Sequence, residues 1–274
     1  MGLYDLYKKS PRVGLALGSG GIRGASHIGV IKVLEENKIP IDFIAGSSVG
    51  AIIGGGYAAL KDIKKIEELT LSMKWRDTLS LLDTSFKGGI IKGAKIHEFL
   101  EKILGRLTFK DLKIPFVAVA TDIKTGETIL LSEGNLTQAI RASAGFPLMV
   151  KPINLKGKLL LDGGLSDPVP VDIVRKMGAD IVIAVNLNSQ DYLKEFKERT
   201  FYSVGARCID IMQYRLSKYG VESAEISIEP FYSLKGGGIK AFKKFFDEDA
   251  KNIILAGEKA TIKILPRIKE LLKI

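Results

Sequence analysis

Short, unbroken runs of apolar residues alternate along the chain with longer segments whose apolar positions recur every three or four residues. The short runs are rich in Val, Ile, Leu and Ala and predict strands buried on both faces, as in a parallel sheet. They lie at 13–17, 43–45, 116–121, 159–161 and 180–187. The longer segments predict helices at 25–36, 51–60 and 249–272. This alternation is typical of an α/β fold.

Two short loops predict that part of the sheet is antiparallel. Lys124-Thr125-Gly126-Glu127 and Lys156-Gly157-Lys158 place a glycine between strand-like segments, as hairpin turns do. With 274 residues, 46% of them hydrophobic, the chain can bury an ample core. We therefore expect a single domain over 1–274, with a C-terminal helical part at about 199–274.

The chain carries a net charge of +10. Its lysines are dispersed and form no recognition module, so we expect no nucleic-acid partner. The abundance of Lys, Glu and Ile also fits adaptation to heat, and a basic surface fits anionic lipid.

Two segments are candidates for contact with lipid. From Ile239 to Phe246, helical spacing places Ile and Phe on one side and Lys on the others, which favours an interfacial helix at a membrane surface. The alternative is a surface helix that packs its Phe side on the core. Residues 75–91 mix large apolar side chains with a Gly-Gly pair and predict either a mobile cap over the site or a rigid connection.

The sequence also indicates a cellular setting. The N-terminal residues lack the apolar core of a secretory signal, and no apolar run is long enough to span a bilayer. The lone cysteine, Cys208, permits no internal disulfide and is expected to be a small core residue of a helix. We expect a cytoplasmic protein that binds membranes at most peripherally, with no cofactor and no metal.

The residues Gly46-Ser47-Ser48-Val49-Gly50 form a G-x-S-x-G motif between a predicted strand and a predicted helix. A strand–turn–helix elbow presents a serine hydroxyl sharply, and the helix N-terminus favours developing negative charge. The motif predicts Ser48 as a nucleophile. The alternative is a Gly/Ser-rich turn without chemistry.

A second glycine-rich turn, Gly18-Ser19-Gly20-Gly21-Ile22-Arg23-Gly24, follows the first predicted strand. Arg23 occupies the position of the third glycine of a dinucleotide fingerprint, and the G-K-[ST] ending of a P-loop is missing. Two interpretations remain. The backbone N–H groups of Gly20, Gly21 and Ile22 could hold an oxyanion, or the turn could bind no ligand.

The base that would activate Ser48 is either a histidine or a carboxylate. His27 lies inside the first predicted helix, where a packed histidine is the more common role, and His97 lies among charged residues in a helical stretch. No histidine follows position 97, where a Ser–Asp–His chain order would need one. Asp162 ends an apolar strand before Gly163-Gly164, which suits either a base or a turn-forming residue.

Together these motifs resemble those of the patatin-like phospholipases, over about residues 12–186. The resemblance implies an α/β/α sandwich with a largely parallel central sheet and a lipid acyl hydrolase activity, in a minimal, free-standing version. It also implies that Ser48 is the nucleophile and Asp162 its base, that Gly20, Gly21 and Ile22 with nearby Arg23 form the oxyanion site, and that His27 is structural. Ser19 departs from the pattern, since many members have glycine there. The matching blocks are Gly20-Gly21-Ile22-Arg23-Gly24, Gly46-Ser47-Ser48-Val49-Gly50, Arg141-Ala142-Ser143-Ala144-Gly145-Phe146-Pro147 and Asp162-Gly163-Gly164.

We therefore expect a serine hydrolase that cleaves fatty-acyl esters of phospholipids or lysophospholipids through an acyl-enzyme. The alternatives are a carboxylesterase for soluble esters and a catalytically silent lipid-binding member of the same fold. An aspartate base of ordinary pKa would be ionised at neutral pH, so we expect no histidine-like step on the acid side of the pH–rate profile.

Overall fold

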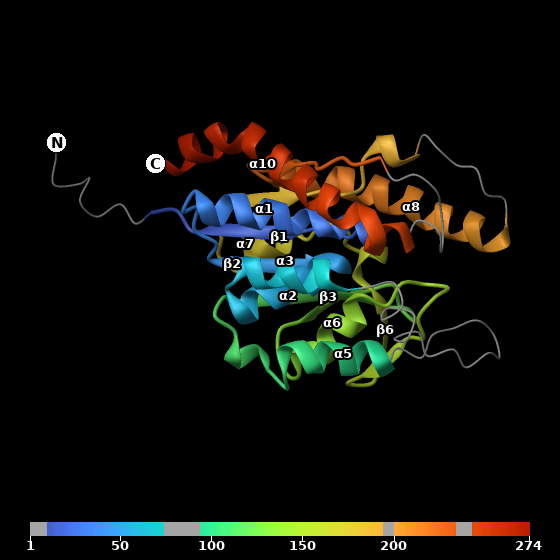
Figure 1. Cartoon of the computed structure of the whole chain (residues 1–274). Coiled ribbons are helices and arrows are strands. Elements are labelled where there is room, and N and C mark those ends of the chain that lie inside the picture. The colour runs from blue at the N-terminus through green and yellow to red at the C-terminus, as the bar shows by residue number, and fades with distance from the viewer. Residues whose placement is uncertain (1–9, 74–93, 194–199, 234–242) are drawn as a thin grey trace.

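A mixed β-sheet forms the centre of the computed structural model, which describes residues 10–73, 94–193, 200–233 and 243–274 (Figure 1). Its strands are β1 Val13–Leu17, β2 Phe43–Ser47, β3 Phe116–Asp122, β4 Thr128–Leu131, β5 Ile153–Leu155, β6 Lys158–Asp162, β7 Ile181–Val185 and β8 Ile226–Ile228. Within the described residues their order is β5-β6-β3-β2-β1-β7-β8, and β4 also pairs with β3. The pairs among β3, β2, β1, β7 and β8 are parallel, whereas β4, β5 and β6 pair antiparallel.

Helices cover both faces of this sheet. Because strand side chains alternate between faces, Leu15 and Ile183 join one apolar cluster while Ala16 and Ala184 join another. The longer helices are α1 Ala25–Glu36, α2 Val49–Leu60, α3 Ile63–Ser72, α5 Ala94–Leu104, α6 Leu136–Ser143, α7 Val171–Lys176, α8 Phe201–Gly220 and α10 Ala250–Leu272. The larger cluster contains residues of α1, α2, α3, α5, α6 and α10, and the smaller contains residues of α7. The predicted α/β/α sandwich is confirmed.

Both predicted hairpin turns are also confirmed. Lys156 and Gly157 have φ values of 52° and 79° and join β5 to β6, as a two-residue turn with two positive φ angles requires. Gly126, with φ 78°, lies in the turn between β3 and β4. This antiparallel edge is what places Asp162 beside the parallel strands.

The long last helix, α10, lies directly on α1, as Figure 1 shows at the top of its view. Two glycines permit this contact, since a Cβ on Gly29 would lie 2.0 Å from the Ile254 carbonyl oxygen and one on Gly257 would lie 2.0 Å from the Ser26 carbonyl oxygen. Lys32 of α1 bonds Glu258 of α10 at 2.9 Å. A helix from the N-terminal part of the chain, α1, and one from its C-terminal part, α10, thus lie in the same helical layer.

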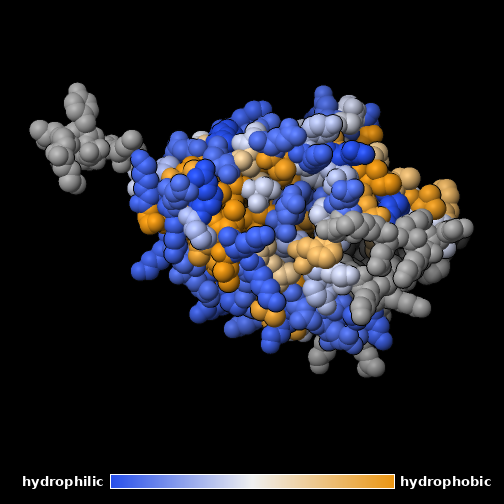
Figure 2. Space-filling model, turned by 90° about the horizontal axis from the view of Figure 1, so that it is seen from above, coloured by the Kyte–Doolittle hydropathy of each residue, from blue (hydrophilic) through white to orange (hydrophobic). Residues whose placement is uncertain are grey.

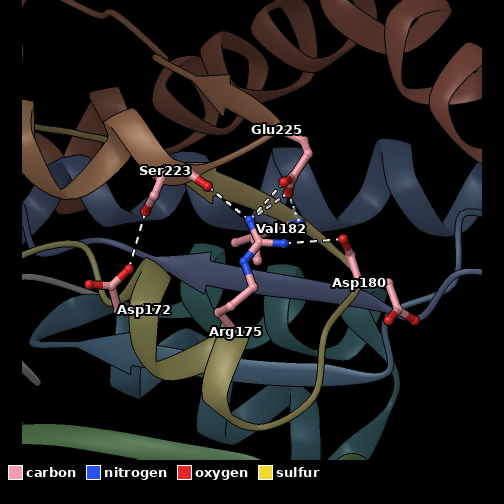
Figure 3. Close-up of polar contacts among 6 residues, drawn as sticks. All are labelled: Asp172, Arg175, Asp180, Val182, Ser223 and Glu225. Atoms are coloured by element: carbon pink, nitrogen blue, oxygen red, sulfur yellow. Dashed lines mark hydrogen bonds and ion pairs between the residues drawn. The ribbon is translucent and has the colours of Figure 1, made fainter.

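Arg175, in the last turn of α7, ties the short edge strand β8 to the sheet (Figure 3). Its guanidinium donates to the carbonyl oxygens of Asp180 at 3.1 Å and Ser223 at 2.8 Å, and to the Glu225 carboxylate at 2.7 Å. Glu225 also accepts the N–H of Val182 at 2.7 Å. This cluster lies at the N-terminal ends of β7 and β8. The loops that follow β1 and β2 lie at the opposite, C-terminal ends of the parallel strands.

One prediction is wrong, and a second is described only in part. Cys208 is exposed on α8, because the buried side of that helix carries Ile209, Gln213 and Ser217 instead. Of the predicted lipid-binding segment, only residues 243–246 are described, so its docking on lipid stays a prediction. Within them Lys243 is exposed, whereas Phe245 is 6% exposed, belongs to the core, and lies edge-on to Phe246 with ring centroids 4.8 Å apart.

The predicted cap at 75–91 lies outside the described residues. Among the helices that are described, none combines the length and apolar character needed to cross a membrane.

Candidate active site

Ser48 lies in a sharp turn between β2 and α2. Its φ of 57° and ψ of −121° are unfavourable for a residue with a side chain. A Cβ on Gly46 would lie 2.4 Å from the Gly50 carbonyl oxygen, and one on Gly50 would lie 2.1 Å from the Leu17 carbonyl oxygen. Close backbone approach within the elbow, and between the elbow and β1, therefore explains the spacing of the G-x-S-x-G motif.

The Ser48 hydroxyl donates a hydrogen bond of 2.6 Å to Oδ2 of Asp162. Asp162 ends β6 opposite Ala120 of β3, and Ser47 of β2 lies opposite Val119 of the same strand. The register of three neighbouring strands thus brings together two residues that are 114 positions apart. Asp162 is fully buried, and Ser48 is 9% exposed.

Further hydrogen bonds fix the position of Asp162. Its Oδ1 accepts the Gly164 N–H at 2.8 Å, and the Thr121 hydroxyl donates to the Asp162 carbonyl oxygen at 2.8 Å. Burial raises the pKa of Asp162 to about 6, against the opposing effect of the bonds from Ser48 and Gly164. The expectation of an ordinary pKa is therefore wrong, because desolvation outweighs those two donors.

Ser143, at the end of α6, supports the elbow from outside. Its hydroxyl accepts the Ser48 N–H at 3.0 Å, and Ser143 itself is fully buried. Sequence reasoning did not predict this contact with Ser48, although Ser143 lies in the 141–147 block of the family resemblance. Gly145 of the same block accepts the Asp162 N–H at 3.1 Å, so the block contacts both members of the Ser–Asp pair.

The glycine-rich loop after β1 packs against the elbow. Gly21, with φ 57°, begins a 3-10 helix over Gly21–Gly24 that leads into α1. The first N–H groups of such a helix have no partner within it and point from a positive dipole end. A Cβ on Gly24 would lie 2.1 Å from Cγ2 of Val49, the residue after Ser48, so loop and serine turn are immediate neighbours.

Arg23 fixes this loop and points toward the loop that follows β7. Its Nε donates to the Gly20 carbonyl oxygen at 2.9 Å, Nη2 donates to Oδ1 of Asn188 at 3.3 Å, and the guanidinium lies 4.4 Å from the ring centroid of Tyr192. In a trans peptide the C=O and N–H point in opposite directions. By holding the Gly20 carbonyl, Arg23 therefore turns the Gly21 N–H away from its own guanidinium.

A buried polar network extends from this loop to α8. Asn188 Nδ2 donates to the Ser19 hydroxyl at 3.2 Å, and that hydroxyl donates to Gln213 Oε1 at 3.4 Å. Ser19, which departs from the glycine common in the family, thus joins the loop to residues far along the chain. The sequence did not point to Asn188 or Gln213, since neither lies in a local motif.

Both histidines have contacts away from the Ser48 hydroxyl. His27 is fully buried and its Nε2 contacts the Gly18 carbonyl oxygen at 2.8 Å, so this nitrogen carries the donated proton. Burial lowers the pKa of His27 to about 4, which keeps the ring neutral. His97 lies on α5 with its Nε2 3.6 Å from Glu101, and its Nδ1 has no hydrogen-bond partner among the described residues.

A strained serine elbow, a glycine-rich loop and a buried carboxylate come together at the C-terminal ends of β1 and β2. This combination is typical of serine hydrolases. The family model "Patatin-like phospholipase" matches residues 15–175. The chain therefore belongs to the patatin-like phospholipase family, which is generally one of lipid acyl hydrolases.

Curated relatives match about two thirds of the chain. An NTE family protein of Mycobacterium tuberculosis (strain ATCC 25618 / H37Rv) is 43% identical over 183 residues, which cover 66% of this chain and 51% of the relative. Human patatin-like phospholipase domain-containing protein 6 is 33% identical over 187 residues, 65% of this chain and 14% of that protein. The Drosophila melanogaster neuropathy target esterase sws is also 33% identical, over 13% of its length. The chain thus spans about half the length of the mycobacterial relative and far less of the others.

Among solved structures, VipD from Legionella pneumophila superposes with a TM-score of 0.66, covering 94% of this chain and 67% of that chain. At 15% identity this likeness concerns the fold alone.

Proposed function

We propose that this chain is a serine acyl hydrolase that cleaves fatty-acyl esters of phospholipids or lysophospholipids through a Ser48–Asp162 dyad. The observation that carries the proposal is the 2.6 Å hydrogen bond from a strained elbow serine to a fully buried carboxylate. Family membership supports a lipid ester as the substrate class, as do relatives named as a phospholipase domain protein and an esterase.

In the acylation half of the reaction, Ser48 Oγ attacks the ester carbonyl carbon while its proton moves to Oδ2 of Asp162. The carbonyl oxygen becomes an oxyanion, which the backbone N–H groups of Gly20, Gly21 and Ile22 stabilise. When the tetrahedral intermediate collapses, the bond to the leaving alcohol or lysolipid breaks and that group takes the proton from Asp162. Ser48 is left as a fatty-acyl ester.

Deacylation reverses the roles. Asp162 accepts a proton from water, whose oxygen attacks the acyl carbon, and the second oxyanion forms at the same site. Collapse releases the fatty acid and returns the proton to Ser48. The raised pKa of Asp162 suits both halves, since the group is a stronger base than an exposed aspartate and is still mostly ionised at neutral pH.

Fluorophosphonate labelling with peptide mapping tests the nucleophile directly. We expect the label on Ser48 in the wild type, none in Ser48→Ala, and hydrolysis reduced by several orders of magnitude in Ser48→Ala and Asp162→Asn. Near-normal hydrolysis by a folded Ser48→Ala variant would overturn the proposal. Turnover of a long-chain phospholipid dispersion relative to a short-chain soluble ester distinguishes a phospholipase from a carboxylesterase.

A further inference from the structure

The long helix α8 exposes large apolar side chains while two of its buried residues are polar. Its buried side carries Ile209 together with the polar Gln213 and Ser217, which are 4% and 0% exposed. Its outer side carries six exposed large apolar side chains, two in the first turn and four from position 211 onward, which helical geometry places on one side and which we call the α8 stripe. The stripe consists of Phe201 92% exposed, Val204 45%, Ile211 44%, Met212 54%, Leu216 40% and Tyr219 70%.

The buried side of α8 has a clear structural task. Gln213 Oε1 accepts a hydrogen bond from the Ser19 hydroxyl, and a Cβ on Gly164 would lie 2.5 Å from Gln213 Nε2. This side therefore faces both the glycine-rich loop and the turn that follows Asp162. The α8 stripe, by contrast, is left open by the described part of the chain, and a contiguous exposed apolar surface is a mark of an interaction site.

The apolar surface continues toward the serine. Leu148 is 45% exposed, has a φ of 69°, and lies against α8, since a Cβ on Gly205 would be 3.1 Å from Leu148 Cδ1. The loop that contains Leu148 begins after Ser143, whose hydroxyl accepts a hydrogen bond from the Ser48 N–H. Figure 2 shows hydrophobic residues gathered at the right of the molecule, the end where α8 projects in Figure 1.

The charges on α8 favour an anionic occupant. Arg215 and Lys218 are exposed beside the stripe, and Arg215 lines an open recess of about 200 Å³ together with Leu193 and Ile211. Asp210, the one acidic residue in the sequence of α8, lies on the inner side and interacts with Arg23 and Arg207. A helix with an exposed apolar stripe and flanking cations is the form that binds at the surface of an anionic bilayer.

We propose that the outer face of α8, with Leu148, docks this protein on an anionic lipid surface and so brings that surface to the rim of the Ser48 site. The inference rests on the proposed function in one respect only, namely that the lipid of that surface is also the substrate of Ser48. Docking itself requires no chemistry at Ser48, so the two proposals fail separately.

The test measures co-sedimentation with vesicles of phosphatidylglycerol and phosphatidylcholine in the Ser48→Ala background, where lipid is not consumed. The stripe variant is Phe201→Ser, Met212→Ser and Tyr219→Ser combined. The matched control changes three exposed apolar residues of α3 and α10 in the same way: Leu71→Ser, Leu255→Ser and Ile262→Ser. We expect the partition coefficient to fall by about tenfold or more in the stripe variant and to stay unchanged in the control.

A charge variant, Arg215→Glu with Lys218→Glu, tests the same face without removing apolar groups and remains informative if the stripe variant does not fold. It should weaken binding at low salt, with a smaller effect at high salt. With Ser48 intact, the stripe variant should hydrolyse a short-chain soluble ester at the wild-type rate.

Equal vesicle binding by the wild type and the stripe variant, or no binding by the wild type, would overturn the proposal. Light scattering addresses the alternative occupant, a second copy of the chain. A wild-type dimer that the stripe substitutions convert to a monomer without loss of vesicle binding would assign the face to self-association instead.

Discussion

The hydroxyl of Ser48 and the carboxylate of Asp162 lie 2.6 Å apart, although β3 separates β2, which leads into Ser48, from β6, which ends at Asp162. The antiparallel pairing of β6 with β3 is what brings the carboxylate back to the level of the serine. No imidazole contacts the Ser48 hydroxyl in this arrangement, because His27 donates to the Gly18 carbonyl oxygen and His97 pairs with Glu101. In the proposed mechanism the proton transfers depend on one carboxylate and its surroundings.

The first prediction concerns the pH dependence of hydrolysis. Since Asp162 must be ionised to accept the Ser48 proton, kcat/KM for a short-chain ester should fall on the acid side with an apparent pKa near 6 rather than near 3.8. A histidine titrates in the same range, so the profile is also measured for His97→Gln, which should retain the acid limb. Disappearance of that limb in His97→Gln would assign it to the histidine.

The second prediction concerns stability at the same residue. The pKa of Asp162 is raised from 3.8 to about 6 in the folded state, so between these values the folded protein binds more protons than the unfolded chain. The free energy of unfolding therefore falls as pH rises through this window, by up to about 3 kcal/mol from this group. Asp162→Asn removes this loss, so its stability relative to the wild type should increase from pH 4 to pH 7. Urea unfolding at both pH values measures the difference, and a pH-independent difference would contradict the assignment.

The third prediction concerns the glycine-rich loop. Arg23→Lys keeps the positive charge but loses the planar fork that joins Gly20 to Asn188. Misplacement of the oxyanion donors by a fraction of an ångström should lower kcat for a soluble ester by about tenfold to a hundredfold, with a small change in KM. Arg175→Lys is the matched control. It disrupts a comparable hydrogen-bonded cluster at the N-terminal ends of the parallel strands, away from Ser48. It should lower the melting temperature without changing kcat. An equal loss of kcat in both variants would indicate a general effect on folding.

A fourth prediction separates the N–H of Gly21 from its conformation. Gly21 has a φ of 57°, and a Cβ added there would meet no atom within 4 Å among the described residues. Gly21→Ala therefore keeps the donor at a cost of roughly 1 kcal/mol of backbone strain. Gly21→Pro removes the donor and cannot adopt this φ, so kcat should fall much further, with a loss of one oxyanion donor alone costing on the order of 3 kcal/mol. Steady-state kinetics on a soluble ester makes the comparison, and equal kcat for the two variants would exclude the Gly21 N–H from the mechanism.

The sequence predicts those features that local patterns encode. Continuous apolar runs identified the strand that leads into Ser48 and the strand that ends at Asp162. The glycine spacings identified the turns, because close backbone contacts demand glycine at these positions. Ser143, Asn188 and Gln213 could not be found in this way, since their roles arise from contacts over 95 to 194 positions of sequence. The polarity of α8 and the burial of Asp162 depend likewise on neighbours that no single segment reveals.

The last prediction concerns the contact between α1 and α10. Gly257 lies in α10 where an added Cβ would come within 2.0 Å of the Ser26 carbonyl oxygen, and the backbone of α1 cannot yield without moving the helix. Gly257→Ala should therefore destabilise the protein by about 1–3 kcal/mol, although alanine is the better helix former.

Gly56 of α2 is the control for this helix contact, because a Cβ there would meet only Ile66 Cδ1, at an ordinary 3.7 Å. At this position the lower backbone entropy of the unfolded chain should dominate, and Gly56→Ala should stabilise the protein by about 0.5–1 kcal/mol. Urea unfolding of both variants gives the two signs. If Gly257→Ala were stabilising as well, the helices would have to separate without cost, and the close packing of α10 on α1 would not contribute to the stability of the fold.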